Sequence, residues 1–267
     1  MTDTTDASAV YSYLEERLGF QTSYYNEDYL DRRLTARMRR TGDESATAYL
    51  DRLESDEQER AALLDALSIN VTEFFRNPEV WTALRDYLRD LTGSRNRVRV
   101  WSAACSDGRE PYSVAMLAVA DDEIQTDSLS ITATDIDEDA LERARSATYE
   151  STRTTDVAEE LAFLDDPERV VDRDGDTFRV GEAARRLVTF DRHDLIDGSA
   201  RADFDVVLCR NLLIYIDRSY KQPIFETLAG SLREGGYLVL GMTETLPRSF
   251  RDEFDPAAKR RRIYRKQ

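Results

Sequence analysis

The sequence predicts an α/β fold in which a helical N-terminal domain precedes a parallel sheet that is covered by helices on both faces and carries a small inserted antiparallel β-subdomain. Residues 8 to about 92 show helical periodicity without strand-like alternation. From Val98 onward, short apolar runs alternate with helical stretches, and this rhythm breaks between about residues 148 and 190. We therefore expect a helical domain over residues 1–75 and an α/β domain over residues 76–267, with the insertion at about 148–190.

The helical domain is predicted from apolar residues that recur on one helix face. Two such sets are Val10, Leu14 and Leu18, and then Leu30, Leu34 and Met38. Asn26 is placed to cap a helix, with acidic residues in the turn that follows, and Gly42 is placed to end the same helix. Ser45 is the predicted N-cap of the next one.

The strands of the α/β domain are predicted from apolar runs separated by helical patterns. In chain order the runs are VRVWSAA, LSITATDI, LVTF, FDVVLCRN and GGYLVLGMTE, with RIYRK as a last, antiparallel strand. Helices are expected over EPYSVAMLAVA, from Asp139 to Ala147 and near Ser219 to Leu232. Within the insertion, VVDRDGDTFRV predicts an antiparallel hairpin that turns at Asp174-Gly175.

Charge narrows the class of protein. The chain of 267 residues carries 53 acidic and 37 basic side chains, a net charge of −16, which argues against binding to nucleic acid or to anionic lipid. The basic side chains are nearly all arginine, which together with the many acids is typical of a halophilic archaeon. An acidic mesophilic protein from a genome that favours arginine is the alternative.

Neither a membrane-spanning run nor a signal-peptide pattern is present, so we expect a cytoplasmic protein without membrane insertion. Two cysteines, Cys105 and Cys209, are too few for a metal cluster or a disulfide framework. We expect reduced thiols and no metal.

Candidate ligand-binding residues stand where predicted strands end, because ligands of open α/β sheets bind beyond the carboxyl ends of the strands. After the first strand, Gly108 and several small residues precede a helix, so the backbone can approach a ligand and the helix N-terminus supplies amide donors. Asp135 ends the second strand, where one carboxylate can accept hydrogen bonds from both ribose hydroxyls. An exposed acid or a helix cap is the simpler interpretation of Asp135. Together the two features favour a nucleoside cofactor, and NAD and S-adenosylmethionine both remain open.

The chain resembles the CheR-type chemotaxis protein methyltransferases over roughly residues 8 to 265. The resemblance rests on linked blocks in the family's order and spacing: INVTEFFRNPEVW, RVWSAACSDGREPYSVAM, ITATDIDEDALERAR, FDVVLCRNLLIYID and GGYLVLGMTETL. It implies a Rossmann-like class I S-adenosylmethionine-dependent methyltransferase domain with a helical N-terminal domain and an inserted β-subdomain. It also implies methyl transfer from S-adenosylmethionine to glutamate carboxylates of chemoreceptors, which gives methyl esters and S-adenosylhomocysteine in sensory adaptation.

The resemblance further implies which residues contact the cofactor. They are Asn70, Thr72, Arg76, Glu110, Asp135, Asp194, Leu195, Arg210 and Asn211. Arg76 would pair with the methionine carboxylate, the incoming glutamate or both, and Tyr215 matches the tyrosine near the transferred methyl. These two residues are therefore expected to align the acceptor. The chain departs from the family at Asp194, where asparagine is usual, which removes an amide donor but keeps an acceptor for the adenine amino group.

Structural roles remain open for several of these residues. Thr72 fits a helix cap, Asn70 a turn, Tyr215 a core aromatic and Arg210 a surface charge. His193 beside Asp194 suggests a general base, but a glutamate acceptor is already ionised near neutral pH and needs none. The implied reaction is a single in-line displacement without metal or covalent intermediate, so positioning and desolvation must supply the rate.

A row of arginines, the basic stripe, makes one predicted helix of the N-terminal domain locally basic, although the chain as a whole is acidic. Arg33, Arg37 and Arg40 recur at helical spacing, with Arg32 and Arg39 beside them. A solvated face paired with local acids is one interpretation. The resemblance implies the other, in which this helix binds the acidic cytoplasmic helices of chemoreceptors. Replacing the three stripe residues with alanine is expected to leave the fold intact.

The sequence leaves three other functions open. One is a methyltransferase with a small acid or RNA as acceptor, the second is a dehydrogenase, and the third is a non-catalytic receptor adaptor that binds cofactor structurally. The missing Gly-x-Gly-x-x-Gly loop disfavours the dehydrogenase, and CRNLLIY stands where an Asn/Asp-Pro-Pro-aromatic segment would mark nitrogen methylation. We expect a monomer, with Cys105 and Cys209 close to the cofactor.

Overall fold

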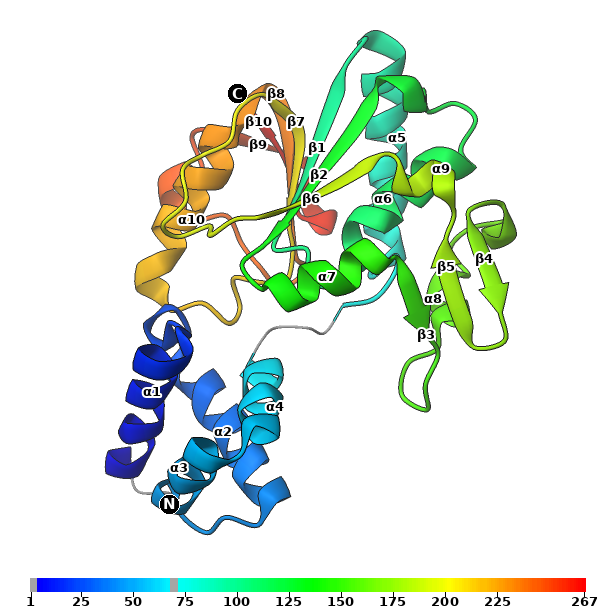
Figure 1. Cartoon of the computed structure of the whole chain (residues 1–267). Helices are drawn as coiled ribbons and strands as arrows, with labels where there is room; N and C mark the ends of the chain where they lie inside the picture. The colour runs from blue at the N-terminus through cyan, green and yellow to red at the C-terminus, as the bar shows by residue number, and fades with distance from the viewer. Residues whose placement is uncertain (1–3, 68–71) are drawn as a thin grey trace. The chain divides into compact units, whose positions relative to one another are not determined.

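The computed structural model describes residues 4–67 and 72–267, and it divides the chain into two compact units (Figure 1). The helical unit comprises the chain up to residue 70 together with Tyr215–Lys221, and the second unit comprises Val71–Ile214 and Gln222–Gln267. The sequence pattern places residues 215–221 in the second domain, whereas their contacts group them with the helices. Asn70, one of the predicted cofactor residues, lies outside the described residues.

The helical unit follows the predicted pattern. Its described elements are α1 (Thr4–Leu18), η1 (Thr22–Tyr24), α2 (Glu27–Thr41), α3 (Ala46–Ser55) and α4 (Glu57–Leu67).

All three predicted caps are confirmed. The side chains of Asn26 and Ser45 accept hydrogen bonds from the backbone N–H groups of Tyr29 (2.9 Å) and Ala48 (3.2 Å), and Gly42 ends α2 at a φ of 80°. That φ is accessible to glycine at little cost.

The core of the helical unit is made by the residues that the periodicity selects. Val10, Leu14, Leu30, Leu34 and Met38 are buried, and Leu18 packs against them. Burial of these side chains on one face of each helix is what holds the helices together, since isolated helices of this length are marginal in water.

The second unit is built on a seven-stranded sheet. Its strands are β1 (Val98–Ala103), β2 (Leu129–Asp135), β6 (Val188–Arg192), β7 (Phe204–Cys209), β8 (Leu232–Leu240), β9 (Phe254–Ala258) and β10 (Ile263–Lys266). The order across the sheet is β6-β2-β1-β7-β8-β10-β9. Pairing is parallel from β6 to β8 and antiparallel at β10 and β9.

Strand order reverses between β1 and β7, because the chain first adds strands on one side of β1 and then on the other. A parallel sheet leaves a crevice beyond the carboxyl ends of its strands at such a point. The predicted sheet is confirmed, except that β9 was not expected. Four of the five residues of this edge strand, Pro256 among them, lie at the surface or nearly so, and it therefore gives no apolar signal.

Helices cover the sheet on both sides, as predicted. They are α5 (Pro78–Ser94), α6 (Arg109–Ala120), α7 (Glu138–Ser146) and α10 (Arg218–Ser231), with short 3₁₀ turns η2 (Thr126–Ser128), η4 (Arg248–Phe250) and η5 (Lys259–Arg261). The short helix α9 (Glu182–Arg185) contacts α6. Figure 1 shows α10 on one side of the sheet and α5 and α6 on the other. All six residues of β7 are buried, as is usual for a strand covered on both faces.

A small antiparallel sheet confirms the predicted insertion. It has the order β3-β5-β4, with β3 (Thr148–Glu150), β4 (Val171–Asp174) and β5 (Thr177–Val180), and is accompanied by α8 (Val157–Leu161) and η3 (Pro167–Arg169). Asp174 pairs with Thr177, so the two loop residues are Gly175 and Asp176, one position later than predicted. Gly175 has a φ of 60°, which suits a two-residue hairpin loop.

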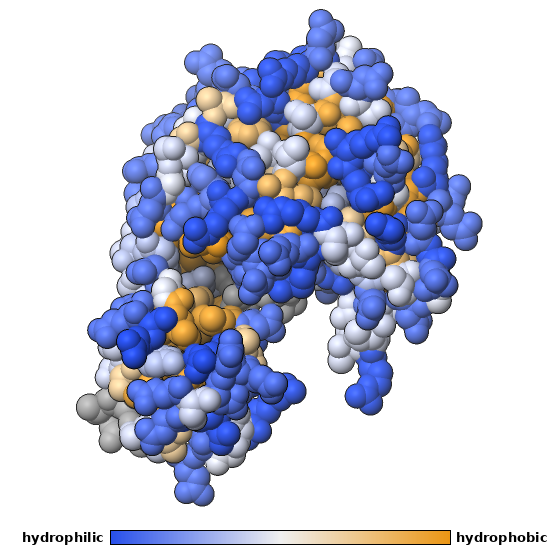
Figure 2. Space-filling view, in the orientation of Figure 1, coloured by the Kyte–Doolittle hydropathy of each residue, from blue (hydrophilic) through white to orange (hydrophobic). Residues whose placement is uncertain are grey.

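Polar residues cover most of the face shown in Figure 2. Among the described residues, the exposed large hydrophobic side chains are Ile136 and Ile214. No helix within residues 4–67 and 72–267 is long and apolar enough to cross a membrane. Likewise, the described part of the chain has no group of His, Cys, Asp and Glu side chains arranged to hold a metal ion.

Candidate cofactor and acceptor site

The turn between β1 and α6 is shaped for close approach of a ligand. Ala104, Ser106 and Gly108 all have positive φ, so the backbone bends sharply just before the N-terminus of α6. A Cβ at Gly108 would lie 2.8 Å from the Cβ of Ala144 and 3.2 Å from the hydroxyl of Tyr149. Only glycine fits there, which supplies the physical reason for the glycine that the sequence singled out.

Asp135 lies at the carboxyl end of β2 and holds this turn. Its Oδ2 accepts from the backbone N–H of Ser106 (2.7 Å), and its Oδ1 accepts from that of Asp137 (3.1 Å). Burial raises the pKa of Asp135, although these backbone N–H groups act in the opposite direction. Each carboxylate oxygen has two acceptor positions, so the two ribose hydroxyls can be accommodated beside the existing bonds.

Glu110 and Arg210 form the buried charged centre of the site. Ser102 at β1 donates its hydroxyl to Glu110 Oε1 (2.7 Å), and Arg210 Nη1 lies 3.6 Å from Glu110 Oε2. Burial raises the pKa of Glu110, while the charges of Arg210 and Arg76 lower it. This separation is too long for a hydrogen bond, so Glu110 Oε2 keeps acceptor capacity.

Arg210 also fastens the end of β7 to the start of α5. Its Nη2 donates to the carbonyl of Arg76 (2.8 Å) and to Oδ1 of Asn77 (2.9 Å), and its guanidinium lies 5.5 Å from the Trp81 ring centre. Arg210 is therefore a buried structural cation and not the surface charge that one interpretation of the sequence allowed. Thr72 and Arg76, which lie in the segment before α5, are half-buried.

Asp194 and Leu195 follow β6. Asp194 Oδ1 accepts from the N–H groups of Ile196 (2.8 Å) and Asp197 (3.3 Å), so this carboxylate shapes its own turn, and Leu195 is buried. The neighbouring His193 has Nε2 3.1 Å from the carbonyl of Ser199. This contact ties the His193 ring to the turn after β6, and the expectation that His193 is no general base stays a prediction.

Tyr215 groups with the helical unit. Asn26 donates its N–H to the Tyr215 carbonyl (2.9 Å), Tyr25 and Ile216 form an antiparallel bridge, and the rings of Tyr215 and Tyr29 lie 4.8 Å apart. Glu110, Asp135 and Arg210 thus lie at or just beyond the strand ends, whereas Tyr215 packs against the N-terminal end of α2. Its role at the acceptor stays a prediction.

Glu244 is a residue of this region that the sequence interpretation missed. It follows β8, is 4% exposed, and accepts from the backbone N–H groups of Asn211 (3.0 Å) and Leu213 (2.7 Å). Asn211 itself has a φ of 63°. The sequence feature that could have indicated Glu244 is its position three residues after Gly241, just past an apolar run that predicts a strand.

The basic helix α2 does not present all its arginines to solvent. The Arg37 side chain is 14% exposed and forms two hydrogen bonds with Glu59, Nε to Oε1 (3.0 Å) and Nη2 to Oε2 (2.5 Å). Tyr49 donates its hydroxyl to the same carboxylate (2.5 Å). Arg37 is therefore not the solvated side chain that replacement with alanine presumed, and its loss would leave Glu59 buried without its cation.

The remaining arginines of the stripe differ in exposure. Arg33 lies over the Tyr29 ring, 5.3 Å from its centre, and is half-buried. Arg32, Arg39 and Arg40 are exposed. These three are the ones placed to meet a partner, and receptor binding by them stays a prediction.

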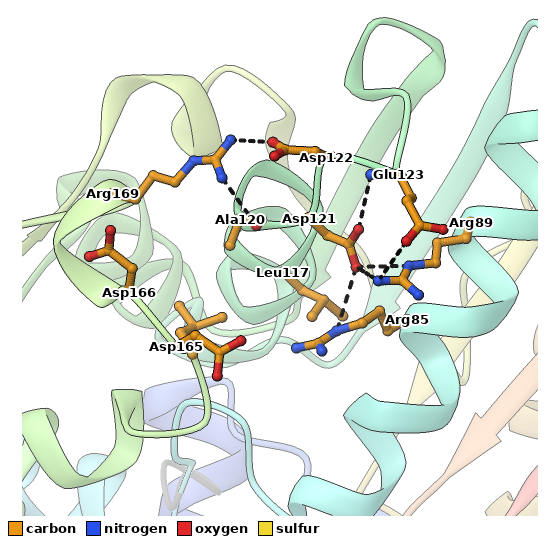
Figure 3. A pocket seen from close by; sticks show the side chains of 11 residues that line it. Arg85, Arg89, Leu117, Ala120, Asp121, Asp122, Glu123, Asp165, Asp166 and Arg169 are labelled. Atoms are coloured by element: carbon orange, nitrogen blue, oxygen red, sulfur yellow. Dashed lines mark hydrogen bonds and ion pairs between the residues drawn. The ribbon is translucent and has the colours of Figure 1, made fainter.

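A separate pocket of about 380 Å³ lies where the end of α6 meets α5 and η3 (Figure 3). Arg89 pairs with Asp121 (2.8 Å) and Arg169 with Asp122 (2.5 Å). None of the predicted site residues lines it, and it lies roughly 16 Å along α6 from the turn at Gly108 by the helical rise. We assign it no part in the chemistry.

Asp135→Ala is expected to weaken binding of S-adenosylhomocysteine by about 1.5–3 kcal/mol, or at least tenfold, because a charged acceptor for two hydroxyls is lost. Calorimetric titration measures it, and the exposed neighbour Asp139→Ala is the control. Because Asp135 also holds the turn at Ser106, thermal melting should be recorded in parallel. Equal affinity in wild type and variant would refute the ribose assignment.

Both cysteines are expected to react slowly with a thiol reagent in the native protein. Cys105 and Cys209 are buried near the ends of the neighbouring strands β1 and β7, and burial raises the pKa of each thiol well above its usual value. The thiolate is the nucleophile, so little reactive form is present. Rapid native labelling would contradict the structure, and complete labelling in urea is the control. Protection by bound cofactor is correspondingly expected to be small.

The doubly wound sheet, with acids and amide donors beyond its strand ends, is a fold that binds a nucleoside cofactor at this edge. The chain belongs to the CheR methyltransferase family: residues 70–263 match the family's SAM binding domain and residues 6–68 match its all-alpha domain. Membership confirms the resemblance and excludes a dehydrogenase.

Two curated chemotaxis protein methyltransferases are similar to most of this chain. A chemotaxis protein methyltransferase of Listeria monocytogenes is 33% identical over 234 residues, with 86% of each chain covered. Chemotaxis protein methyltransferase 1 of Vibrio cholerae is 35% identical over 198 residues, with 70% of this chain and 69% of the relative covered. Both are bacterial, so they give no support to the halophilic archaeal source that the composition predicts.

Proposed function

We propose that this protein transfers the methyl group of S-adenosylmethionine to glutamate side chains of chemoreceptors and releases S-adenosylhomocysteine. The observation that carries the proposal is the joint presence of the family's cofactor-binding and all-alpha domains on one chain with a site at the strand ends. The sheet supplies the cofactor site, and the helical unit supplies exposed arginines for an acidic partner.

The cofactor is proposed to lie beyond the ends of β1, β2 and β7. The contacting residues are Asn70, Thr72, Arg76, Glu110, Asp135, Asp194, Leu195, Arg210 and Asn211. Support for the fit comes from Glu110 Oε2, which retains acceptor capacity for the ammonium of the methionine moiety, and from the Asp135 carboxylate at the end of β2, to which we assign the ribose. Arg210 is proposed to act mainly by holding Glu110 and the Arg76 backbone in place.

When bound, S-adenosylmethionine supplies an electrophilic methyl on a sulfonium sulfur. The protein need only bring an ionised glutamate in line with it, so no side chain has to remove a proton. We assign the alignment to Arg76 and Tyr215. An anion and a cation are neutralised as the ester forms, so an arginine that held the glutamate too strongly would slow the transfer.

The receptor is proposed to dock on α2 through Arg32, Arg39 and Arg40, with Arg33 contributing from its place over Tyr29. Arg37 is assigned a structural role in the helical unit, through its ion pair with Glu59. We propose that the protein acts in the cytoplasm, where acidic receptor helices are its partner, without membrane insertion or nucleic acid. We propose that it acts as a monomer.

The test is transfer of radiolabelled methyl from S-adenosylmethionine to purified receptor. The label should enter the receptor and be released as methanol by alkali, because carboxylate esters are alkali-labile. Alkali-stable label would point to nitrogen methylation. Binding of cofactor without any transfer would point to the non-catalytic adaptor.

A further inference from the structure

Glu244 is buried beside the end of β8, where its carboxylate faces a row of backbone donors. Oε2 accepts from the N–H groups of Asn211 (3.0 Å) and Gly241 (2.6 Å), and Oε1 accepts from that of Leu213 (2.7 Å). Burial raises the pKa of Glu244, and backbone hydrogen bonds that also include Ile214 lower it. A single side chain thus joins the strand end of β8 to the segment that leaves β7.

The segment after β7 needs such an acceptor because it is neither strand nor helix. Asn211 is left-handed, with a φ of 63°, so the amides that follow cannot continue the pairing of the sheet. A buried backbone N–H without a partner costs about 1–3 kcal/mol, and a carboxylate satisfies several donors at once. Glu244 therefore fixes the conformation of residues 211–214.

Gly241 makes the close approach possible. β7 and β8 are neighbours, with Cys209 paired to Leu240, so their ends arrive together. A Cβ at Gly241 would lie 2.6 Å from Glu244 Oε2 and 2.8 Å from the Asn211 nitrogen. Any larger residue would push the carboxylate away from the segment.

We propose that Glu244 is a positioning residue for methyl transfer, which acts by fixing the backbone from Asn211 to Ile214 that leads directly into Tyr215. This assignment rests on the proposed function for the roles of Asn211 and Tyr215. Arg210, Glu110 and Asp135 are held by contacts of their own. Of the proposed cofactor contacts only Asn211 depends on Glu244, so loss of Glu244 should weaken cofactor binding slightly and disturb alignment of the acceptor more.

Glu244→Gln keeps the shape of the side chain but turns an NH₂ group towards backbone donors. Relative to wild type, kcat for receptor methylation should fall at least about tenfold, whereas the Kd for S-adenosylhomocysteine should change at most about fivefold. Rates are expressed per cofactor-binding site, so unfolded protein does not count. Glu234→Gln, an exposed residue on β8, removes the same charge and should behave as wild type.

Amide hydrogen exchange gives a readout that requires no receptor. In cofactor-free wild type the Leu213 amide should be protected, and in Glu244→Gln the peptide covering residues 211–214 should exchange at least about tenfold faster while the β-strands keep their protection. Gly241→Ala should give the same local loosening with the carboxylate still present.

An unprotected Leu213 amide in wild type would overturn the proposal, whether or not the variants fold. So would a normal kcat per binding site in Glu244→Gln. If wild type failed to methylate receptor, the proposed function would be refuted. Amide hydrogen exchange would still decide whether Glu244 holds residues 211–214 in place.

Discussion

Arg37→Ala is expected to lower the free energy of unfolding of the helical unit by about 3–5 kcal/mol, because it leaves the buried Glu59 without its cation. The two hydrogen bonds between these side chains and the one from the Tyr49 hydroxyl form a connected network in the core of that unit. Tyr49 still donates in the variant, which places the expected loss towards the lower end of that range. Urea unfolding followed by far-ultraviolet circular dichroism measures it.

Arg40→Ala is the matched control, since it removes the same group from an exposed position of the same helix. It should change the free energy of unfolding by no more than about 0.5 kcal/mol. Joint replacement of Arg37 and Glu59 with methionine should recover most of the stability, because no uncompensated charge remains. A loss below about 1 kcal/mol in Arg37→Ala would contradict the structural role.

Joint replacement of Arg32, Arg39 and Arg40 with alanine is expected to reduce receptor methylation sharply, with a receptor KM raised at least about tenfold, because several charge-assisted contacts to acidic helices are lost. The three residues are exposed on α2, and alanine is a good helix former, so the fold should remain. Affinity for S-adenosylhomocysteine should match wild type. The defect should be largest at low salt, where such attractions are least screened.

A second triple variant, with Arg251, Arg260 and Arg261 replaced by alanine, makes the same change in net charge at exposed positions of the methyltransferase unit. It should methylate receptor normally. Arg76→Ala provides the opposite comparison, because its defect should persist at saturating receptor. Normal KM in the α2 variant, or an equal loss of cofactor binding, would refute docking on this helix.

The order of the elements and the positions of the strands were predictable because the relevant signals are local. Apolar runs such as FDVVLC predict a buried strand, and Asn26, Gly42 and Ser45 satisfy helix ends within a few residues of themselves. The edge strand β9 escaped prediction because few of its side chains enter the core.

The sequence by itself determined the fold class and the family, and it placed the Gly108 turn and Asp135 after the ends of their strands, because in a parallel sheet these positions follow from where each apolar run stops. Glu110, in the first turn of α6, was given only by the resemblance. Only the tertiary structure decided which charged side chains hold the fold. Arg37 is hydrogen-bonded to Glu59, which lies 22 residues away in the chain, and Glu244 is hydrogen-bonded to Asn211, which lies 33 residues away. Helical spacing cannot separate a paired arginine from an exposed one, because pairing depends on which elements pack together. The chain pattern likewise assigned Tyr215 to the second domain, and only its packing against Tyr29 groups it with the helices.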